Sequence, residues 1–479
     1  MSQTTSAGHV SARRVASLVD GFDRAPAYLG LATALQHLIG EGRIGLDVRL
    51  PSERDLTREL GVSRTTVTGA YAWLRDSGYA VARHGSGTYT RVPGGLRRVV
   101  DSSLLPYSGE ADAIDLSCAA PTSPPGLGQV YAEAAEELPA YLGSHGYFPA
   151  GLPRLREAIA RRYAARGLPT TPDQVLVTPG ALSGTALVAQ ALLRPGERAL
   201  VDDPVYPNAA QALRARGLRL VPNVVDPEGW DLEATTATVR ATRPAAAHLV
   251  PDFQNPTGHV MGEEQRARLA HALRSAGTLA VVDEAHCELV LDDVAMPTAF
   301  AAHARDAVTI GSASKAFWGG LRLGWIRAGA EHVDRLSAAR MAMDLGTPVL
   351  EQLVLARLLE DDGALLAGNL DRLRTQRDAL VEAVGEHLPG WSFHRPAGGL
   401  VLWCRLPAPR ASALVAEAER HGVILAAGPT FSTQGGLQHF VRIPWTQPVD
   451  DLREAVRRIA AAWARTPEHE QPRSRAFVA

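Results

Sequence analysis

The sequence has 479 residues, of which 46% are hydrophobic and 21% are charged, and its formal net charge is −2 at pH 7. These values describe a soluble chain that can bury two cores. The sequence has no run of about 18 apolar residues and no signal-peptide pattern. We therefore expect neither a membrane span nor secretion, and the predicted location is the cytoplasm. The three cysteines, Cys118, Cys287 and Cys404, are unclustered. They predict reduced, buried thiols without a disulfide framework or a metal site.

The N-terminal residues 1–25 are rich in Ser, Thr, Ala and Arg and lack a long apolar core, so we expect a flexible tail. Patterns that predict secondary structure begin at Pro26. Apolar residues at helical spacing predict a helix over residues 31–39, which Gly40 ends. A second helix is predicted over residues 52–60, because Ser52 can cap its start and Gly61 its end.

A third helix follows almost at once, over residues 64–75 with Ser63 as its cap. Its Val67, Tyr71 and Leu74 share one inner face. Two short helices joined by Gly-Val-Ser predict a helix-turn-helix, and residues 78–89 predict a β-hairpin wing that turns near Gly87.

This stretch resembles the GntR-type winged helix, and residues 26–92 are assigned to that DNA-binding domain. The resemblance implies that Arg54 contacts phosphate, that Arg64 and Thr66 meet the major groove, and that the wing approaches the minor groove. The candidate DNA-binding residues are Arg54, Ser63, Arg64, Thr65, Thr66 and Gly87. Between Pro26 and Pro93 there are eight Arg and six acidic residues, so non-specific DNA binding should be modest. Residues 93–115 then read as a linker.

Lys315 is the only lysine in the chain, beside 48 arginines. A guanidinium stays protonated, whereas a lysine amine can lose its proton and attack a carbonyl to form an imine. Ser312, Ser314 and Arg322 offer hydroxyls and a guanidinium to a phosphate nearby. An aldehyde and a phosphate on one ligand indicate pyridoxal 5'-phosphate. The alternative is a lysine retained by chance.

Here the chain resembles the fold-type I aminotransferases, over residues 116–466, with a tail at 467–479. We therefore expect an α/β fold with a large domain built on a mostly parallel sheet and a small α+β C-terminal domain. Asp283 ends an apolar strand and would pair with the pyridine nitrogen. Asn255 resembles the partner of the ring hydroxyl, and Tyr206 the aromatic over the ring face. Amides of Gly180, Ala181 and Leu182 precede a helix and would hold phosphate.

Near the C-terminus, residues 395–405 and 439–445 read as strands of the small domain. By the same resemblance, Arg442 would bind the α-carboxylate of a substrate or effector; the alternative is a surface arginine on an edge strand.

Three departures from the family pattern matter. Ala285 and His286 stand where many members have a tyrosine, Tyr147 follows Gly146 where a neighbouring subunit's tyrosine often reaches phosphate, and Ala181 replaces a hydroxyl residue. His286 and Tyr147 are candidate cofactor contacts.

A GntR-type winged helix followed by an aminotransferase-like domain resembles the MocR family of bacterial regulators. The resemblance implies a head-to-tail homodimer that binds operator DNA and senses pyridoxal 5'-phosphate, or an amine or amino acid that reacts with it. Weak transaminase activity is compatible with the departures. Two alternatives stay open: an active aminotransferase with a structural N-terminal domain, and a DNA-binding protein whose enzyme-like domain only dimerises.

Overall fold

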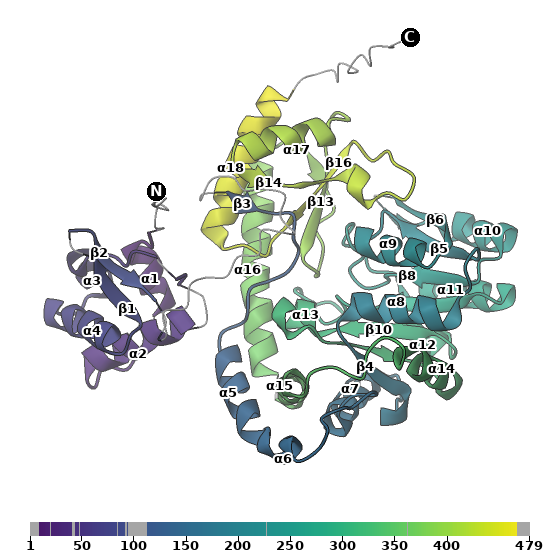
Figure 1. The fold of residues 1–479 in the computed structure, drawn as a ribbon. Helices are drawn as coiled ribbons and strands as arrows, with labels where there is room; N and C mark the ends of the chain where they lie inside the picture. The colour runs from purple at the N-terminus through teal and green to yellow at the C-terminus, as the bar shows by residue number, and fades with distance from the viewer. Residues whose placement is uncertain are drawn as a thin grey trace, which may run out of the picture. The chain divides into compact units, whose positions relative to one another are not determined.

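The computed structural model describes residues 9–466 except 20, 41–43, 47, 84, 92, 94–112, 227 and 362. It divides into two compact units (Figure 1), the first containing Met1–Ala113 and Pro125–Gly128 and the second containing Ile114–Pro124 and Gln129–Ala479. Most of the expected linker and all of the expected C-terminal tail lie outside the described residues.

The first unit is a helical domain with a two-stranded wing. Its elements are α1 (Ala12–Leu18), α2 (Ala27–Gly40), α3 (Glu53–Leu60), α4 (Arg64–Asp76), β1 (Ala80–Arg83) and β2 (Gly87–Thr90). The three helices expected from the sequence and the antiparallel wing are confirmed, although α2 begins four residues earlier than predicted. Ser52 and Ser63 accept the capping hydrogen bonds from the backbone amides of Asp55 and Thr66. Gly61 ends α3 with φ 62°, a left-handed conformation that glycine adopts without strain.

Helix α1 corrects the expectation of a flexible tail before residue 26. Ser11 caps this helix, and Val15 and Val19 are almost fully buried in the core of the unit, beside Leu31, Leu35 and Val67. Leu18 and Phe22 also pack against this core, so the apolar residues of the segment have a helical spacing that the expectation of a tail overlooked. Their burial against other helices stabilises α1.

The second unit contains the remaining elements, except that the first two residues of α5 belong to the first unit. Its longer helices are α5 (Leu127–Glu137), α7 (Pro153–Ala165), α8 (Ala181–Leu192), α9 (Pro207–Ala215), α10 (Leu232–Thr242), α11 (Glu263–Ala276), α14 (Ala330–Arg340), α15 (Val349–Glu360), α16 (Ala364–His387), α17 (Ala411–Arg420) and α18 (Val449–Arg465). Its short helices are α6 (Pro139–Leu142), α12 (Phe300–His303), α13 (Ala313–Ala316), η1 (Pro172–Gln174), η2 (Gly319–Leu321) and η3 (Gly428–Phe431). Its strands are β3 (Ile114–Asp115), β4 (Val175–Thr178), β5 (Arg198–Asp203), β6 (Arg219–Asp226), β7 (Gly229–Trp230), β8 (Ala246–Leu249), β9 (Leu279–Asp283), β10 (Val308–Ser312), β11 (Gly324–Arg327), β12 (Ser392–Phe393), β13 (Val401–Arg405), β14 (Val423–Ile424), β15 (Ala426–Ala427) and β16 (Phe440–Pro444).

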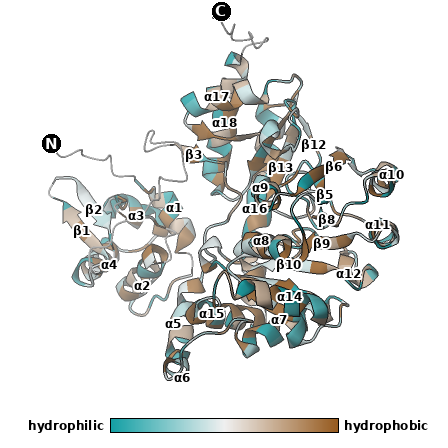
Figure 2. Ribbon diagram, turned by 45° about the vertical axis from the view of Figure 1, so that its right-hand side comes forward, coloured by the Kyte–Doolittle hydropathy of each residue, from teal (hydrophilic) through white to brown (hydrophobic). Residues whose placement is uncertain are grey.

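The large domain is built on an eight-stranded sheet in the order β4-β11-β10-β9-β8-β5-β6-β7. Strands β10, β9, β8, β5 and β6 run parallel, whereas β11 and β7 are antiparallel to their neighbours. The sheet is enclosed by helices (Figure 2), and every residue of β4, β8, β10 and β11 is buried. Strands covered on both faces favour such apolar runs, and parallel strands bring their carboxyl ends to one edge.

The small domain has a four-stranded antiparallel sheet in the order β12-β13-β16-β15. Only Val401–Arg405 of the expected 395–405 strand is extended as a strand; the segment before it includes Gly399, whose φ of 81° breaks the strand conformation. Strand β3, whose residues the sequence assigned to the linker, pairs in parallel with β14. The long helix α16 packs against α18 in the core of this domain (Figure 1).

The three cysteines are free, but the expectation that all are buried is wrong for two of them. Cys404 is buried in β13, Cys287 is partly exposed, and Cys118 is exposed. Among the described residues, no helix is both long and apolar enough to cross a membrane.

Because Val15 is fully buried, Val15→Ala should destabilise the winged helix by about 2 kcal/mol through lost burial and an unfilled cavity. Amide hydrogen exchange over residues 27–90 of the full chain measures this local stability. Arg13→Ala, at an exposed position of the same helix, is the matched control. Unchanged protection in Val15→Ala would mean that α1 does not support the domain.

Candidate cofactor site and DNA-reading surface

Lys315 lies on α13, directly after the carboxyl end of β10. Its Nζ donates a hydrogen bond of 2.8 Å to the backbone carbonyl of Ala119. Burial of the amine lowers the pKa of Lys315, and the nearby charge of Arg442 lowers it further, while Asp283 opposes both. A lowered pKa favours the neutral amine, which is the nucleophilic form.

Asp283 ends β9, the strand next to β10, and the structure therefore brings it beside Lys315 as expected. Its Oδ1 accepts a hydrogen bond of 2.9 Å from the backbone amide of Ala285. Burial raises the pKa of Asp283, while His248, the Ala285 amide and Lys315 favour its charged form. A cationic ring nitrogen at this carboxylate would stabilise the charge further.

His248 belongs to this cluster and was missed by the sequence reasoning. It lies on β8, in register with Val281 of β9, and it is 2% exposed. Burial lowers the pKa of His248, whereas Asp283 raises it, so the imidazole and the carboxylate influence each other. A single histidine inside a buried strand is usually a core residue. Only the strand register identifies this one as a neighbour of Asp283.

The start of α8 forms a cradle of backbone amides. Gly180 precedes the helix with φ 90°, and no side chain caps the amides that follow it. Arg322 approaches from η2, where its Nη2 donates to the carbonyl of Pro179 at 3.3 Å. A Cβ on Gly180 would lie 3.1 Å from this Nη2, and a Cβ on Gly324 would lie 2.6 Å from the amide nitrogen of Ala181. The cradle is thus kept open by glycines.

Other expected phosphate-site residues lie around this cradle. Ser312 and Ser314 are buried at the end of β10, and Ser312 Oγ accepts a hydrogen bond from the Ser314 amide at 3.2 Å. Leu182 is 37% exposed in the first turn of α8. Its backbone amide therefore lies at the start of α8, where a phosphate-binding amide was expected, while its side chain is partly exposed to solvent.

Arg442, on β16, contacts Asn255. Its Nη1 donates to Asn255 Oδ1 at 3.4 Å, and its Nη2 donates to the carbonyl of Ser117. The guanidinium lies 4.7 Å from the ring centroid of Phe431. Arg442 is 5% exposed, and burial lowers its pKa to about 10. The alternative of a surface arginine on an edge strand is wrong.

Tyr206 contributes an aromatic ring beside this arginine. Its hydroxyl accepts a hydrogen bond from Asn208 Nδ2 at 2.9 Å, and the charges of Tyr206 and Arg442 shift each other's pKa. Tyr147 behaves differently, since it is 57% exposed and its ring tilts against His145 with the centroids 5.5 Å apart. Within one described chain, Tyr147 makes no hydrogen bond or ring contact with the Lys315 cluster.

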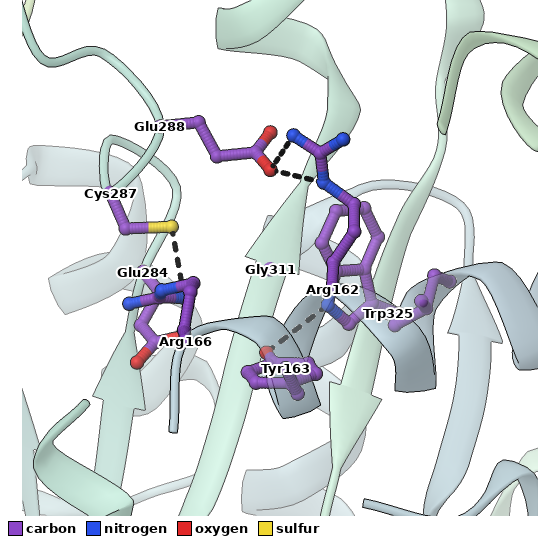
Figure 3. Close-up of a pocket in the computed structure, with 9 residues that line it drawn as sticks. Arg162, Tyr163, Arg166, Glu284, Cys287, Glu288, Gly311 and Trp325 are labelled. Atoms are coloured by element: carbon purple, nitrogen blue, oxygen red, sulfur yellow. Dashed lines mark hydrogen bonds and ion pairs between the residues drawn. The ribbon is translucent and has the colours of Figure 1, made fainter. Parts of the chain in front are cut away.

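A separate polar cluster begins one residue after Asp283 (Figure 3). Arg166 Nη1 donates to Glu284 Oε2 at 3.0 Å and to Cys287 Sγ at 3.3 Å, and Arg162 pairs with Glu288. The cavity among these side chains is about 20 Å³, room for roughly one water molecule. Burial of the Cys287 thiol raises its pKa well above the usual range, which favours the protonated, less nucleophilic form. The cluster stabilises the strand end that carries Asp283.

The first unit presents the expected DNA-reading residues on its surface. Arg54, Ser63, Arg64 and Thr65 are exposed, and Thr66 is partly exposed because its hydroxyl contacts Ser63 Oγ at 2.8 Å. The side chain of Arg64 is 79% exposed, with its Nε 3.9 Å from Glu53. Such a weak surface pair leaves the guanidinium available to a base edge or a phosphate.

The wing depends on a glycine at its turn. Gly87 has φ 115°, and a Cβ there would lie 2.9 Å from Arg49 Nε. Ser86 Oγ and Tyr89 OH are 2.6 Å apart, and Arg83 stacks 4.1 Å from the Tyr89 ring. Side chains of the wing itself therefore contact one another beside the turn.

The fold and the cluster around Lys315 define a fold-type I aminotransferase-like protein that also carries a winged helix. Residues 114–459 match the family described as aminotransferase class I and II, and residues 27–90 match the bacterial regulatory proteins of the gntR family. The chain belongs to the class I and II aminotransferase family and has the domain arrangement of the MocR-type regulators.

Individual relatives agree with this assignment. The chain is 29% identical to the uncharacterized HTH-type transcriptional regulator YdcR of Escherichia coli (strain K12), covering 87% of this chain and 94% of that protein. It is 28% identical to the HTH-type transcriptional regulator TauR of Rhodobacter capsulatus, covering 86% and 92%. Among solved structures, it is similar to LysN, the α-aminoadipate aminotransferase of Thermus thermophilus, complexed with N-(5'-phosphopyridoxyl)-L-leucine. That similarity has a TM-score of 0.68 and 28% identity over 74% of this chain and 93% of that one.

The family implies pyridoxal 5'-phosphate, and the residues present fit it. The amine of Lys315 suits the aldehyde, Asp283 suits the ring nitrogen, and the uncapped start of α8 with Arg322 suits the phosphate. Arg442 adds an independent observation, because its buried Nε lacks a hydrogen-bond partner among the described residues. Buried polar atoms without partners indicate a missing ligand or water.

Borohydride reduction in the presence of pyridoxal 5'-phosphate should attach the cofactor to the peptide that contains Lys315, since this is the only side-chain amine of the chain. Peptide mass mapping identifies the labelled residue. Lys315→Arg keeps the positive charge and should remain unlabelled. A label confined to the N-terminal amine of the wild-type protein would refute the assignment.

Proposed function

We propose that the protein is a cytoplasmic DNA-binding transcriptional regulator that senses pyridoxal 5'-phosphate, or an amine or amino acid that reacts with it, through its aminotransferase-like domain. The observation that carries this proposal is the occurrence, in one chain, of an exposed Arg64 on a capped recognition helix and of a Lys315 amine whose pKa burial lowers. The first feature reads DNA, and the second binds an aldehyde.

Each residue of the site has a distinct task in this proposal. Bound cofactor would supply an electron sink. Lys315 supplies the amine, Asp283 holds a proton on the ring nitrogen, and the amides after Gly180 with Arg322 bind phosphate. Asn255 Oδ1 is used by Arg442, which leaves the Asn255 amide nitrogen to donate to the ring hydroxyl. Arg442 is the candidate site for an effector carboxylate.

The contacts of this site suggest how occupancy reaches the DNA-binding domain. Lys315 donates to the carbonyl of Ala119, and Arg442 donates to the carbonyl of Ser117. Both carbonyls belong to the segment that follows β3, immediately after the expected linker. A ligand that engages the amine or the guanidinium competes for these hydrogen bonds. If the ligand binds one conformation of this segment more tightly than another, ligand binding and DNA binding become coupled, as regulation requires.

A homodimer is part of the proposal. Exposed apolar side chains gather on two neighbouring segments, where Leu142 and Tyr147 are 70% and 57% exposed and Met341 and Met343 are 55% and 53% exposed. A Cβ on Gly346 would lie 2.7 Å from the Phe148 carbonyl, so the two segments touch. Exposed apolar side chains on neighbouring segments favour a protein interface, and Tyr147 would then face a partner's site.

An active aminotransferase is the second candidate function. It is favoured by the presence of both Lys315 and Asp283, whose charges influence each other, and by the similarity to the solved aminotransferase from Thermus thermophilus. The replacement of the family's tyrosine by Ala285 and His286 argues against efficient turnover.

Arg64→Ala should weaken binding to a selected operator by about 1 to 3 kcal/mol and relax sequence preference, whereas Arg54→Ala should weaken all sequences alike and flatten the salt dependence. Fluorescence anisotropy with specific and random duplexes over a salt series separates these effects. Arg420→Ala removes an equally exposed charge from the second unit and serves as the control. Equal losses on both duplexes for Arg64→Ala and Arg54→Ala would contradict the assignment of roles.

Pyridoxal 5'-phosphate or an amino acid should change operator affinity by roughly 5-fold to 150-fold, equivalent to a coupling of about 1 to 3 kcal/mol. Lys315→Ala should still bind operator but lose this response. Operator binding and conversion of the cofactor to its amine form are followed together with a panel of amino acids. Turnover on the order of 1 per second, without any ligand-dependent change in DNA binding, would make the protein an enzyme.

A further inference from the structure

A cationic groove lies between α10 and α11 of the large domain, two helices that pack side by side (Figure 1). Its volume is about 570 Å³. The lining combines Arg240, Arg243, Arg268 and His271 with alanine, serine and threonine side chains, and no Asp or Glu of the described residues takes part in it. None of the residues around Lys315 lines this groove, so it is separate from the cofactor site.

The spacing of the four cationic residues brings them to the groove. Arg240 lies in the last turn of α10, and Arg243 follows three residues later, directly after the helix end. Arg268 and His271 have the same spacing on α11. Residues three apart lie on one face of a helix, so each helix contributes a pair of cationic side chains to the groove. All four residues are exposed, and Arg274 Nη2 lies 3.3 Å from His271 Nδ1.

These guanidinium groups are not neutralised by carboxylates. Within the part of the chain that the structure describes, Arg240, Arg243 and Arg268 form no ion pair, whereas the exposed Arg420 of α17 is paired with Glu417. Like charges that share a surface repel one another. An anion bound in the groove would therefore stabilise it.

The chemistry of the lining favours phosphate groups over a protein partner. Protein interfaces are centred on aromatic and other large apolar side chains, and the groove has none. Guanidinium groups donate paired hydrogen bonds to phosphate oxygens, and serine and threonine hydroxyls also contact DNA phosphates. Helix α10, with 11 residues, is about 17 Å long, which corresponds to about five phosphates of one DNA strand.

The charge of the winged helix gives a second DNA contact a physical purpose. Between Pro26 and Pro93 there are eight Arg and six acidic residues, an excess of only two positive charges. The electrostatic part of DNA affinity grows with the number of phosphates that a protein neutralises. Cations elsewhere in the chain would therefore add affinity that the DNA-reading unit lacks.

We propose that the groove between α10 and α11 is a second DNA-binding surface, at which Arg240, Arg243 and Arg268 bind the phosphate backbone of the duplex that flanks the operator. Phosphate contacts carry no base information, so this surface adds affinity without sequence preference. The inference rests on the proposed function, because it requires the winged helix to bind operator DNA.

The triple variant Arg240→Ala/Arg243→Ala/Arg268→Ala of the full-length protein tests this surface. Fluorescence anisotropy over a salt series compares an operator recovered by in vitro selection with the same operator extended by about 30 base pairs on each side, or about 100 Å of helix per side. The wild-type protein should bind the extended duplex more tightly. The triple variant should lose this gain, roughly tenfold at low salt, and its plot of log affinity against log salt should be shallower by about 2 to 3.

The matched control is Arg420→Ala/Arg453→Ala/Arg457→Ala, which removes the same net charge from α17 and α18, where each arginine is paired with a carboxylate. It should keep both the gain and the salt slope. Lysine at the three groove positions preserves the charge and should preserve the slope. If the triple alanine variant does not fold, Arg268→Ala alone, which should flatten the slope by about 1, decides.

The results separate the two hypotheses. A wild-type protein that binds no duplex with sequence preference would refute the proposed function and this inference together. Operator binding by the wild-type protein, with an unchanged gain and slope in the triple alanine variant, would refute the groove alone. An equal loss in the control variant would also overturn it, because net charge would then be the cause. A triple variant with intact DNA binding and an altered oligomeric state in sedimentation would assign the groove to a second copy of the chain.

Discussion

The candidate site depends on one electrostatic constraint, which is the placement of an amine and a carboxylate near each other in a poorly solvated part of the protein. Burial raises the pKa of Asp283 and lowers the pKa of Lys315, so both groups are driven toward their neutral forms. Their mutual attraction opposes this. Adjacent parallel strands β9 and β10 end at the same edge of the sheet and impose the pairing. A cationic ring between them would stabilise the carboxylate without requiring a charged lysine.

The bias toward arginine follows the architecture of the same fold. Arg266 is fully buried, and its Nε, Nη1 and Nη2 donate to Met261, Thr298 and Asp252. Arg377 is buried in a comparable way. A planar fork can bond several acceptors in fixed directions, whereas an ammonium offers a single nitrogen. These buried guanidinium groups thus hydrogen-bond separate segments to one another, whereas Lys315 is the candidate nucleophile.

Much of this site could be predicted from the sequence, because its residues follow strands whose apolar runs are evident. Lys315, Asp283, Asn255 and Arg442 come together as expected. His248 could not be predicted, since its role depends on the register between β8 and β9. Helix α1 was missed because the Ser-, Ala- and Arg-rich composition around it outweighed the helical spacing of Val15, Leu18, Val19 and Phe22, which pack against the core. The exposure of Cys118 was missed because a cysteine's sequence neighbours do not determine which surface is left uncovered.

The same geometry explains why a site of this family can suit regulation. Turnover requires interactions that strengthen only in the transition state, whereas sensing requires only that a ligand prefer one of two conformations. The carbonyls of Ser117 and Ala119 accept hydrogen bonds from Arg442 and Lys315, the two groups suited to a carboxylate and an aldehyde. Occupying both groups removes both bonds from one short segment.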